Sequence, residues 1–463
     1  MTPFLKSSTA AVAALGRQKY VAANEYRPSR FCVSARVPVG TLFYSTLTKE
    51  MVLVAEGEEV LPSVRKYLVE HWFYMPRNLN EEALIAPVRK TARLLSERYG
   101  KLTTFVILTT TECNARCYYC YEAGRPQGRM TRETADRTIE YVKRHGAPRV
   151  SIQWFGGEPL YNVEAIDYIS SRLDAAGIEY SSRMISNGYL FDQDMVKRAS
   201  DLWRLRSVQI TLDGTEDVYN RTKRYVETDD GSPFKRVVRN VSLLLDAGIR
   251  VDLRLNVSKS NSEDLIQLVD YLGKNIGSRK GLWLYAAPLF QYLEDPEVHH
   301  DVIELQLRCD KLTGNSSPAS STYNPYRKRF RRISFNQCMA DFANSILISP
   351  EGNLARCEHY YHDPVGTLED GITDREKYDS WNEVLPPLPE CSVCPIAPDC
   401  MRLSRCDPLR WAHGACPNHG DMNLTRKQVT DLMLEYYEKY KDKVDTIDDE
   451  REAKEAEAEG LRW

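Results

Sequence analysis

The sequence has no long apolar run, no excess of one charge and too few cysteines for a disulfide-stapled scaffold. No stretch of about 18 consecutive apolar residues occurs in the 463-residue chain, which excludes an ordinary membrane-spanning helix. Lys and Arg number 62 and Asp and Glu number 65, so the formal charge of −3 gives no electrostatic reason to bind nucleic acid or an anionic membrane. We therefore expect a cytoplasmic protein with neither a nucleic-acid nor a membrane partner.

The 12 cysteines are few but clustered. Three lie within residues 113–120 and seven lie between residues 338 and 416. Clusters of this kind are typical of metal or iron–sulfur ligation in a reducing compartment. The remaining two, Cys32 and Cys309, belong to neither set, and we interpret them as core or surface thiols.

Hydrophobic residues make up 42% of the chain, which excludes wholesale disorder, and the length predicts more than one domain. Residues 28–100 show two strand patterns followed by two helical patterns, at 30–37, 41–54, 58–71 and 81–99. This order predicts a small winged-helix-like α+β module. The alternative is an N-terminal cap on the next domain.

Strand and helix patterns alternate over residues 101–300. Six strand patterns lie at 105–108, 151–155, 183–186, 207–212, 251–257 and 282–289. Five helical patterns lie between them, near 131–145, 163–176, 192–203, 234–247 and 262–275, with Thr131 and Asp192 as expected N-caps. The alternation predicts an α/β fold, a partial (β/α)6 barrel of the TIM type, with its chemistry at the C-terminal ends of the strands.

The remaining segments carry weaker patterns. We expect a flexible tail at 1–27, a linker at 301–335, a cysteine-rich domain at 336–423, and a helix with an acidic tail at 424–463. The cysteine-rich domain has little apolar periodicity, so we expect bound metal rather than apolar burial to hold it together.

The strongest motif follows the first barrel strand directly, where Cys113, Cys117 and Cys120 have the spacing C-x3-C-x2-C. Three thiolates on one loop can hold three irons of a cubane cluster and leave the fourth iron open to a substrate or cofactor. The alternative is structural zinc, which would need a fourth ligand from elsewhere in the chain.

This spacing, with Tyr119 before the third cysteine, resembles the loop of the radical S-adenosylmethionine superfamily. The resemblance implies that the open iron of a [4Fe–4S] cluster binds S-adenosylmethionine. It also implies that reductive cleavage of this cofactor releases a 5′-deoxyadenosyl radical. An electron donor such as flavodoxin or ferredoxin would then be a partner.

Gly156, Gly157 and Glu158 end the second strand and resemble the family segment that contacts the methionyl amine. Two glycines permit close backbone approach to a ligand, and a carboxylate can accept hydrogen bonds from an ammonium group. Taken alone, the segment would be an ordinary turn.

Two further strand ends fit the resemblance. Ser186 and Asn187 end the third strand and are similar to the family's ribose-contacting position. Asp213 ends the fourth strand, and Arg224 follows it as a candidate partner of the cofactor carboxylate. The alternative for Arg224 is a surface salt bridge.

The seven C-terminal cysteines resemble the SPASM extension of radical enzymes, which holds two auxiliary [4Fe–4S] clusters. The resemblance assigns one cluster to Cys391, Cys394, Cys400 and Cys416, and the other to Cys338, Cys357 and Cys406. The sixth cysteine of the family pattern is expected at 404, where this chain has Ser404, and the fourth ligand of the second set is not identified. Three [4Fe–4S] clusters are therefore expected in all, and a pair of zinc ribbons is the alternative for this domain.

The N-terminal module is similar to the PqqD-like element of enzymes that modify ribosomally made peptides. Such elements bind the leader of a precursor peptide as an added strand, and residues 30–54 contain the candidate edge. We therefore expect a peptide maturase that forms an intramolecular crosslink, with a thioether favoured over a carbon–carbon or ether link.

Two rival functions remain open at this point. One is oxidation of a Cys or Ser to formylglycine, as in anaerobic sulfatase maturation, for which Glu358, directly after Cys357, would be the candidate general base. Relatives of that type carry Asp at this place. The other is an iron–sulfur scaffold that binds a peptide without chemistry, for which an intact cofactor segment such as Glu158 would be unnecessary.

Overall fold

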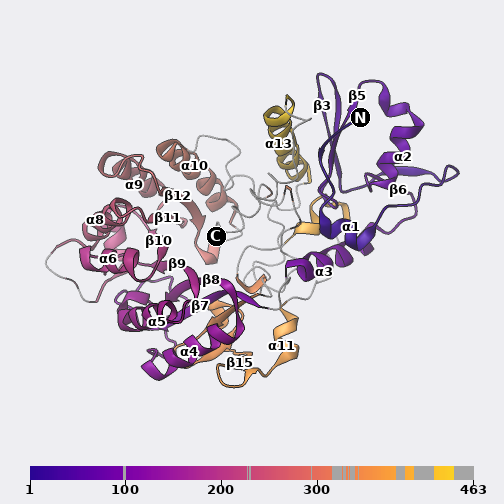
Figure 1. Cartoon of the computed structure of the whole chain (residues 1–463). Helices are drawn as coiled ribbons and strands as arrows, with labels where there is room; N and C mark the ends of the chain where they lie inside the picture. Colours follow the sequence, from indigo (N-terminus) through magenta and orange to yellow (C-terminus); the bar gives the residue numbers. More distant parts are fainter. Residues whose placement is uncertain are drawn as a thin grey trace.

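The computed structural model shows a barrel-like domain and an N-terminal module, with C-terminal segments between them (Figure 1). It describes residues 1–96, 101–226, 228, 231–292, 295–314, 326, 330, 331, 333, 339–341, 344–381, 392–400 and 422–442. The predictions for the acidic tail and for four cysteines lie outside the described residues: Cys338, Cys391, Cys406 and Cys416.

The barrel domain is built on six parallel strands that neighbour one another in chain order. They are β7 (Leu102–Thr110), β8 (Gly146–Gly156), β9 (Glu179–Ser186), β10 (Leu205–Leu212), β11 (Arg250–Val257) and β12 (Leu282–Pro288). All six were predicted, and the expected α/β fold with a large, mostly parallel sheet is confirmed.

The same sheet continues beyond β7 into the C-terminal region, which the sequence did not indicate. Strand β13 (Ser345–Ile348) pairs parallel to β7, and β14 (Asn353–Ala355), β15 (Gly366–Thr367) and β16 (Gly371–Ile372) follow as antiparallel neighbours. The cysteine-rich region therefore begins as an extension of the barrel sheet and not as a separate layer.

Seven helices accompany the parallel strands within the described residues. They are α4 (Arg132–His145), α5 (Val163–Ala175), α6 (Gln193–Asp201), α7 (Glu216–Lys223), α8 (Pro233–Asp246), α9 (Ser262–Asn275) and α10 (Pro296–Thr313). Five were predicted, and the side chains of Thr131 and Asp192 cap α4 and α6 as expected. Helix α7 is short and polar, so it gave no apolar pattern. Helix α10 packs on β12 and crosses the boundary that we placed at residue 300.

Side chains along the parallel strands point alternately to the helix-facing core and to the inner face of the sheet. In β11, Val251, Leu253 and Leu255 are fully buried and join the core formed with the helices. The intervening residues, Asp252 and Arg254, therefore point to the opposite, inner face of the sheet.

The N-terminal module contains a four-stranded antiparallel sheet in the order β1-β5-β4-β3. The strands are β1 (Thr2–Leu5), β3 (Cys32–Val37), β4 (Gly40–Ser45) and β5 (Met51–Ala55). The helices are α1 (Thr9–Leu15), α2 (Pro62–Glu70) and α3 (Ile85–Ser96), and two short strands, β2 (Tyr26–Pro28) and β6 (Tyr74–Pro76), pair beside them.

Residues 1–27 differ from the expected flexible tail. Strand β1 pairs with β5, and α1 packs against α3, because Phe4, Leu5 and Ala11 supply apolar side chains that the module buries. The expected single strand pattern at 41–54 is also two strands, since the chain turns at Lys49 with a left-handed φ of 65°.

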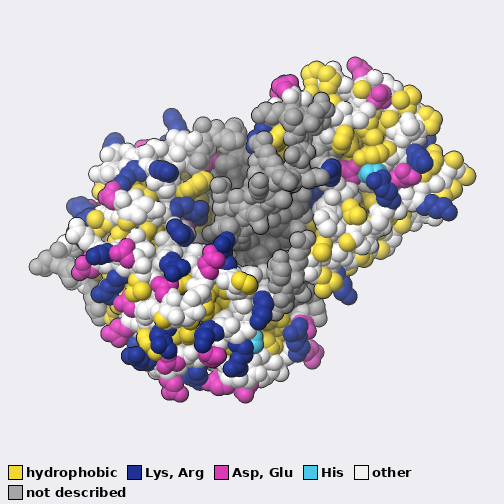
Figure 2. Space-filling view, in the orientation of Figure 1, with side chains coloured by type: hydrophobic (Ala, Val, Ile, Leu, Met, Phe, Trp, Pro, Cys, Tyr) yellow, Lys and Arg dark blue, Asp and Glu magenta, His cyan; other side chains and the backbone are white. Residues whose placement is uncertain are grey.

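Helix α13 (Met422–Tyr440) lies between the module and the barrel and packs against β3 (Figure 1). Its buried face includes Val429, Met433 and Tyr437, which belong to the same core as the module's strands. In the part of the chain that the structure describes, no helix is both long and apolar enough to cross a membrane. Figure 2 shows basic and acidic side chains interspersed over the visible barrel face, as the balanced composition suggests.

Candidate active site

The cysteine loop lies at the C-terminal end of β7, where the fold was expected to place its chemistry. Cys113 and Cys117 are partly buried and Cys120 is exposed. Burial raises the pKa of the Cys113 thiol to about 12, and Glu158 and the other two thiols add to the shift. The three sulfur groups therefore share one electrostatic environment, and bound metal would offset the cost of ionising them.

A cubane cluster and a single zinc ion would use this loop differently. The three thiolates of a cubane bind three different irons, whereas structural zinc would take all three thiolates with a fourth ligand from elsewhere in the chain. Zinc therefore stays the alternative for this loop.

Tyr119 is fixed by a buried ion pair behind the loop. Its hydroxyl donates to Asp213 Oδ1 at 2.8 Å, and Lys223 Nζ lies 3.0 Å from the same hydroxyl and 3.1 Å from Asp213 Oδ2. Asn256 Nδ2 also donates to Asp213 Oδ1, at 2.8 Å. Burial opposes charge on Lys223, but Asp213 and Tyr119 keep the pKa of Lys223 well above its usual value.

Sequence reasoning missed Lys223, because a lysine in a short polar helix looks like a surface residue. The carboxylate of Asp213 pairs with this lysine, and its contact with the cofactor stays a prediction. Asp213 and Lys223 are each only 3% exposed as side chains. The side chains of Asp213 and Lys223 therefore hold Tyr119 in place, and Tyr119 directly precedes Cys120, the third cysteine.

Glu158 is fully buried and accepts three hydrogen bonds. The donors are Ser186 Oγ at 2.9 Å, the Asn187 amide at 2.7 Å and the Leu160 amide at 3.2 Å. Burial raises the pKa of Glu158 to about 7, while these donors and Lys223 favour the anion. The structure thus brings together the ends of β8 and β9, as the resemblance implied.

Gly156 and Gly157 allow the end of β8 to approach the end of β7 closely. A Cβ on Gly156 would lie 2.0 Å from the Thr110 carbonyl oxygen, and one on Gly157 would lie 2.3 Å from the Glu112 carbonyl oxygen. We expected the glycines to admit a ligand. Their closest neighbour is the chain itself, at the point where β7 passes into the cysteine loop.

Asn187 connects the end of β9 to the cysteine loop. Its Nδ2 donates to Asn114 Oδ1 at 2.7 Å and lies 3.9 Å from Cys113 Sγ. Asn114 is 1% exposed, and its Nδ2 has no hydrogen-bond partner among the described residues. A buried amide donor beside a cysteine sulfur is suited to an acceptor that a bound group supplies.

Arg224 forms no salt bridge within the described residues, and its contact with the cofactor carboxylate stays a prediction. It ends α7 with a left-handed φ of 47°, is exposed, and its Nε donates to the Arg116 carbonyl at 2.8 Å. The amide of Arg116 in turn donates to the Lys223 carbonyl at 2.8 Å. Arg224 therefore supports the backbone between the first two cysteines.

The inner face of the sheet has one apolar and one polar side. The apolar side gathers buried residues from β7, β8, β13 and the segments beside them: Val106, Leu108, Phe155, Met339, Leu347, Ala355 and Tyr361. The polar side carries Arg183, Asp252 and Arg254 on β9 and β11. Such a face can exclude water on one side and orient a polar group on the other.

Glu358 faces the polar side of this inner surface. It begins a 3-10 turn (Glu358–Tyr360) after Cys357, and its Oε2 is buried without a hydrogen-bond partner among the described residues. Burial raises the pKa of Glu358, and Arg183 opposes the shift. The pKa of the adjacent His359 is lowered to about 4 by burial, Arg125 and Arg254. The pair thus offers a proton-accepting carboxylate beside a neutral imidazole.

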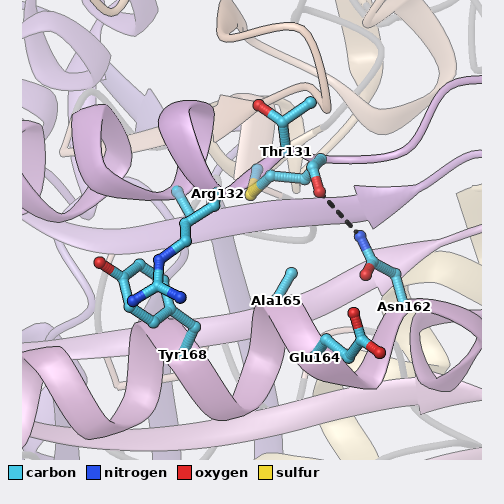
Figure 3. Close-up of a pocket in the computed structure, with 8 residues that line it drawn as sticks. Thr131, Arg132, Asn162, Glu164, Ala165 and Tyr168 are labelled. Carbon is cyan, nitrogen blue, oxygen red and sulfur yellow. Dashed lines mark hydrogen bonds between the residues drawn. The ribbon is translucent and has the colours of Figure 1, made fainter.

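A separate cavity of about 160 Å³ lies between the starts of α4 and α5 (Figure 3). Arg132 lies over the Tyr168 ring at 4.3 Å, and Asn162 Nδ2 donates to the Met130 carbonyl at 3.1 Å. These groups sit in the helix layer and satisfy one another, and none of the sulfur ligands lines the cavity. It is therefore not the candidate active site.

Comparison with known proteins agrees with this geometry. Residues 107–272, from within β7 to within α9, match the model of the Radical SAM superfamily. The chain carries a radical SAM domain. The match covers the cysteine loop, Glu158, Asn187 and Asp213, but neither the N-terminal module nor the C-terminal cysteines.

Three relatives of the radical SAM domain are informative. The GTP 3′,8-cyclase of Clostridium perfringens (strain SM101 / Type A) is 22% identical over 300 residues, which span 61% of this chain and 89% of the relative. The Fe-coproporphyrin III synthase of Methanosarcina barkeri is 25% identical over 186 residues, which span 39% of this chain and 43% of the relative. The structure of histidine-tagged anSMEcpe with bound AdoMet aligns with a TM-score of 0.55 at 16% identity, over 76% of this chain and 97% of that one. At this identity the likeness shows the fold.

The residues present fit the cofactors that radical SAM enzymes use, S-adenosylmethionine and a [4Fe–4S] cluster. Cys113, Cys117 and Cys120 supply three thiols on one loop and leave one cluster corner without a ligand from that loop. The unpartnered amide of Asn114 and the carboxylate of Glu158 lie beside them. The site can therefore hold an anionic cluster and a cationic ligand together.

The described auxiliary cysteines fall into two separate places. Cys394 and Cys400 lie in residues 392–400 and belong to the core of the N-terminal module. Cys357 follows β14 and lies at the barrel end. The assignment of the first two to one cluster and of Cys357 to another stays a prediction.

Proposed function

We propose that this chain is a radical SAM enzyme that modifies a ribosomally made precursor peptide by installing an intramolecular crosslink. A thioether is the favoured product, and a carbon–carbon or ether link is the alternative. The observation that carries the proposal is the N-terminal α+β module, whose sheet ends in the edge strand β3 and whose core includes Cys394 and Cys400.

Strand β3 is the proposed docking edge for the leader of the precursor peptide. One side of β3 pairs with β4, and the outer side of β5 pairs with β1. The other side of β3 pairs with no strand among the described residues, so it is the candidate edge within residues 30–54. Helix α13 packs beside β3 and Arg426 reaches the Cys32 carbonyl at 3.5 Å, which supplies one wall. An extended peptide that adds to such an edge gains main-chain hydrogen bonds.

When bound, S-adenosylmethionine and its cluster supply a 5′-deoxyadenosyl radical that removes a hydrogen atom from a carbon of the peptide. The chain's own residues position and protect that event. Tyr119, held by Asp213 and Lys223, fixes the cysteine loop, and Glu158 accepts hydrogen bonds from the cofactor's ammonium group. The apolar half of the inner face excludes water that would quench a reactive carbon centre.

Glu358 is the proposed general base for a substrate thiol or hydroxyl. Its carboxyl oxygen is buried and has an unused hydrogen-bonding position, and burial makes the carboxylate a stronger base than an exposed glutamate. Loss of that proton would leave a nucleophilic sulfur or oxygen, which would bond to the carbon radical, and the one electron left over would pass to an auxiliary cluster.

Two auxiliary [4Fe–4S] clusters complete the proposal, which makes three with that of the radical SAM domain. Their proposed ligands are Cys338, Cys357 and Cys406 for one, and Cys391, Cys394, Cys400 and Cys416 for the other. An open iron in the first set would accept a substrate thiolate, and a flavodoxin or ferredoxin would supply electrons.

The two rival functions, formylglycine formation and a scaffold without chemistry, would use these residues differently. Formylglycine formation needs a base at position 358 but gives no role to the module's docking edge. A scaffold without chemistry gives no role to the buried Glu158 network. The fold likeness to anSMEcpe does not choose between these, because it concerns the barrel architecture.

Anaerobic reconstitution with iron, sulfide, reductant and S-adenosylmethionine tests the proposal. The wild-type chain should release 5′-deoxyadenosine, and replacement of Cys113, Cys117 and Cys120 by Ala should abolish the release. A peptide co-expressed from a reading frame beside the gene should lose about 2 Da, or two hydrogens, for each crosslink. A new aldehyde in the peptide, detected with a hydrazide reagent, supports the first rival, because oxidation of Ser to formylglycine removes two hydrogens just as a crosslink does. Absence of deoxyadenosine from the wild type supports the scaffold.

A further inference from the structure

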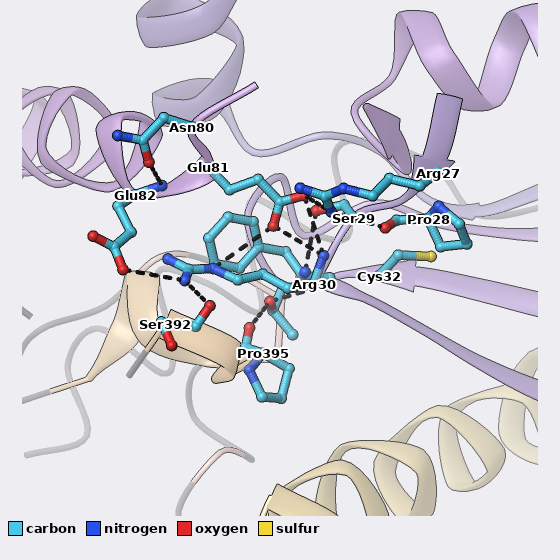
Figure 4. Close-up of polar contacts among 12 residues, drawn as sticks. Arg27, Pro28, Ser29, Arg30, Cys32, Asn80, Glu81, Glu82, Ser392 and Pro395 are labelled. Carbon is cyan, nitrogen blue, oxygen red and sulfur yellow. Dashed lines mark hydrogen bonds and ion pairs between the residues drawn. The ribbon is translucent and has the colours of Figure 1, made fainter. Parts of the chain in front are cut away.

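Residues 392–400 lie against the N-terminal module, although the two are far apart in sequence (Figure 4). Several side chains of the module donate hydrogen bonds to backbone carbonyls of this segment. The pairs are Arg30 with Ser392, Thr46 with Pro395, and Arg89 with Pro398 at 2.9 Å and with Cys400 at 3.0 Å. The donors come from three separate parts of the module, so the segment is held along its whole length.

A buried ion pair adds to these contacts. Lys49 Nζ pairs with Asp399 Oδ2, and both side chains are only 2% exposed. Asp399 directly precedes Cys400, and Lys49 lies at the turn between β4 and β5. A buried pair of this kind adds geometric specificity, because either charge alone would be left uncompensated in the core.

The backbone conformation of Lys49 also indicates that its side chain is needed at this turn. Its φ of 65° is left-handed, a conformation that glycine adopts at little cost and that a lysine adopts only against steric resistance. Glycine would suit this turn better if the turn alone mattered. The lysine side chain supplies what glycine cannot, which is the ammonium group that reaches Asp399.

Apolar packing completes the contact. Cys394, Ile396, Ala397 and Cys400 are buried in one cluster with strand and helix residues of the module, including Phe31, Leu42, Met75 and Val88. Two backbone hydrogen bonds, from Asp399 to Ile396 and from Cys400 to Ala397, lie inside this packed segment. The segment is therefore part of the module's core.

We propose that the N-terminal module positions the Cys394–Cys400 segment, with Lys49 and Arg89 as positioning residues, so that the peptide-docking unit and this cysteine pair form one mechanical unit. The positioning of this segment follows from the contacts described above. Its consequence for catalysis rests on the proposed function, in which Cys394 and Cys400 are ligands of an auxiliary cluster. It also means that deletion of residues 1–100 would strip the partners from Asp399 and Cys400, and would not remove a docking site alone.

Hydrogen–deuterium exchange with mass spectrometry, on the full chain after anaerobic reconstitution, tests the claim. In Lys49→Met, amide exchange in peptides covering residues 392–400 should speed up tenfold or more, because Asp399 loses the buried countercharge of Lys49 and the segment opens locally. Exchange in α5, within the barrel core, should stay at the wild-type rate. Lys66→Met is the matched control, since its pair with Glu70 is exposed by 57% and 29%, and it should change neither region.

Two further variants keep the outcome decisive. Lys49→Arg keeps the charge and should retain slow exchange. Lys49→Met combined with Asp399→Leu replaces the pair by apolar side chains and should restore most of the protection. The proposal is overturned if exchange at 392–400 is unchanged in Lys49→Met, if the double variant is no better than the single one, or if α5 opens equally.

A spectroscopic readout connects the claim to the cluster. Lys49→Met should lower iron per chain by about one cluster and change the spectrum of the reduced auxiliary centre, while the response of the Cys113 loop to S-adenosylmethionine is retained. Faster exchange with unchanged iron would uphold the positioning role and contradict the assignment of Cys394 and Cys400 as cluster ligands. The two claims can thus fail separately.

Discussion

At the scale of single residues, burial sets the chemistry around the cysteine loop. Glu158 is 0% exposed, and the loss of hydration competes with three hydrogen-bond donors for control of its charge. The result is a carboxyl group close to balance at neutral pH. A bound ammonium group would tip that balance toward the anion, so the site is prepared for a cationic ligand.

The first prediction concerns the pH dependence of stability. The pKa of Glu158 rises from 4.5 to about 7 on folding, so the folded state favours the protonated form. The stability contribution is complete below pH 4.5 and is lost as pH rises through about 7, and it amounts to ~3 kcal/mol. The Glu158→Gln variant should lack this change of the free energy of unfolding with pH.

Urea unfolding of the metal-free chain at several pH values checks this, with the fluorescence of the fully buried Trp154 and Trp203 as the signal from the barrel. The free energy of unfolding of the wild type, relative to that of Glu158→Gln, should fall between pH 4.5 and 7. Parallel pH profiles for the two proteins would show that Glu158 does not titrate in this range.

The second prediction concerns the ion pair behind Tyr119. Lys223→Met should lower the free energy of unfolding by about 3–5 kcal/mol, because Asp213 would stay buried without a countercharge. Lys235→Met is the matched control, since its pair with Glu216 is exposed by 67% and 36% and should contribute less than about 1 kcal/mol. Equal losses in the two variants, measured by the same urea titration, would contradict the structural role of Lys223.

At the scale of elements, the site is made where strand ends meet. The cysteine loop follows β7, the segment with Glu158 follows β8, and Asn187 follows β9. The order of strands in a parallel sheet puts these ends at one edge, which is why the sequence predicted their proximity. It could not predict the role of the glycines, because close approach between β7 and β8 depends on strand register, which the sequence pattern does not contain.

The third prediction tests that strand contact. Gly156→Ala would place a Cβ 2.0 Å from the Thr110 carbonyl at a φ of 141°, so β8 would have to move away from β7. We expect a loss of more than about 2 kcal/mol in the free energy of unfolding. Gly248→Ala has a φ of 75° with nothing within 4 Å, and should cost only about 1 kcal/mol of backbone strain. A thermal denaturation series that ranks the two variants the other way would refute this account of Gly156.

Other elements escaped sequence reasoning for physical reasons. Helix α7 has too few apolar residues to give a helical period, and Lys223 at its end is buried only because Asp213 and Tyr119 come from distant parts of the chain. Strand β13 is four residues long, which is too short to give a clear period of its own. Short elements of this kind are defined by their partners and not by their own pattern.

At the scale of the whole molecule, the N-terminal module and residues 392–400 share one core. The sequence predicted both parts and their order, since each has its own local pattern. It could not predict that Lys49 meets Asp399, or that β1 occupies the outer edge of β5, because such contacts join residues that are distant in the chain. The radical SAM barrel, by contrast, is built from neighbours in sequence and was predicted strand by strand.

The central claim is that Cys113, Cys117 and Cys120 hold a [4Fe–4S] cluster with one corner open to S-adenosylmethionine. The most direct measurement is the electron paramagnetic resonance spectrum of the dithionite-reduced chain, recorded with and without S-adenosylmethionine. We predict a cluster signal that shifts on addition of the cofactor and that disappears from the Cys113→Ala, Cys117→Ala, Cys120→Ala variant. Signals of auxiliary clusters should persist in that variant. A spectrum in which no component responds to the cofactor, or a cofactor-responsive component that survives loss of all three thiols, would contradict the account.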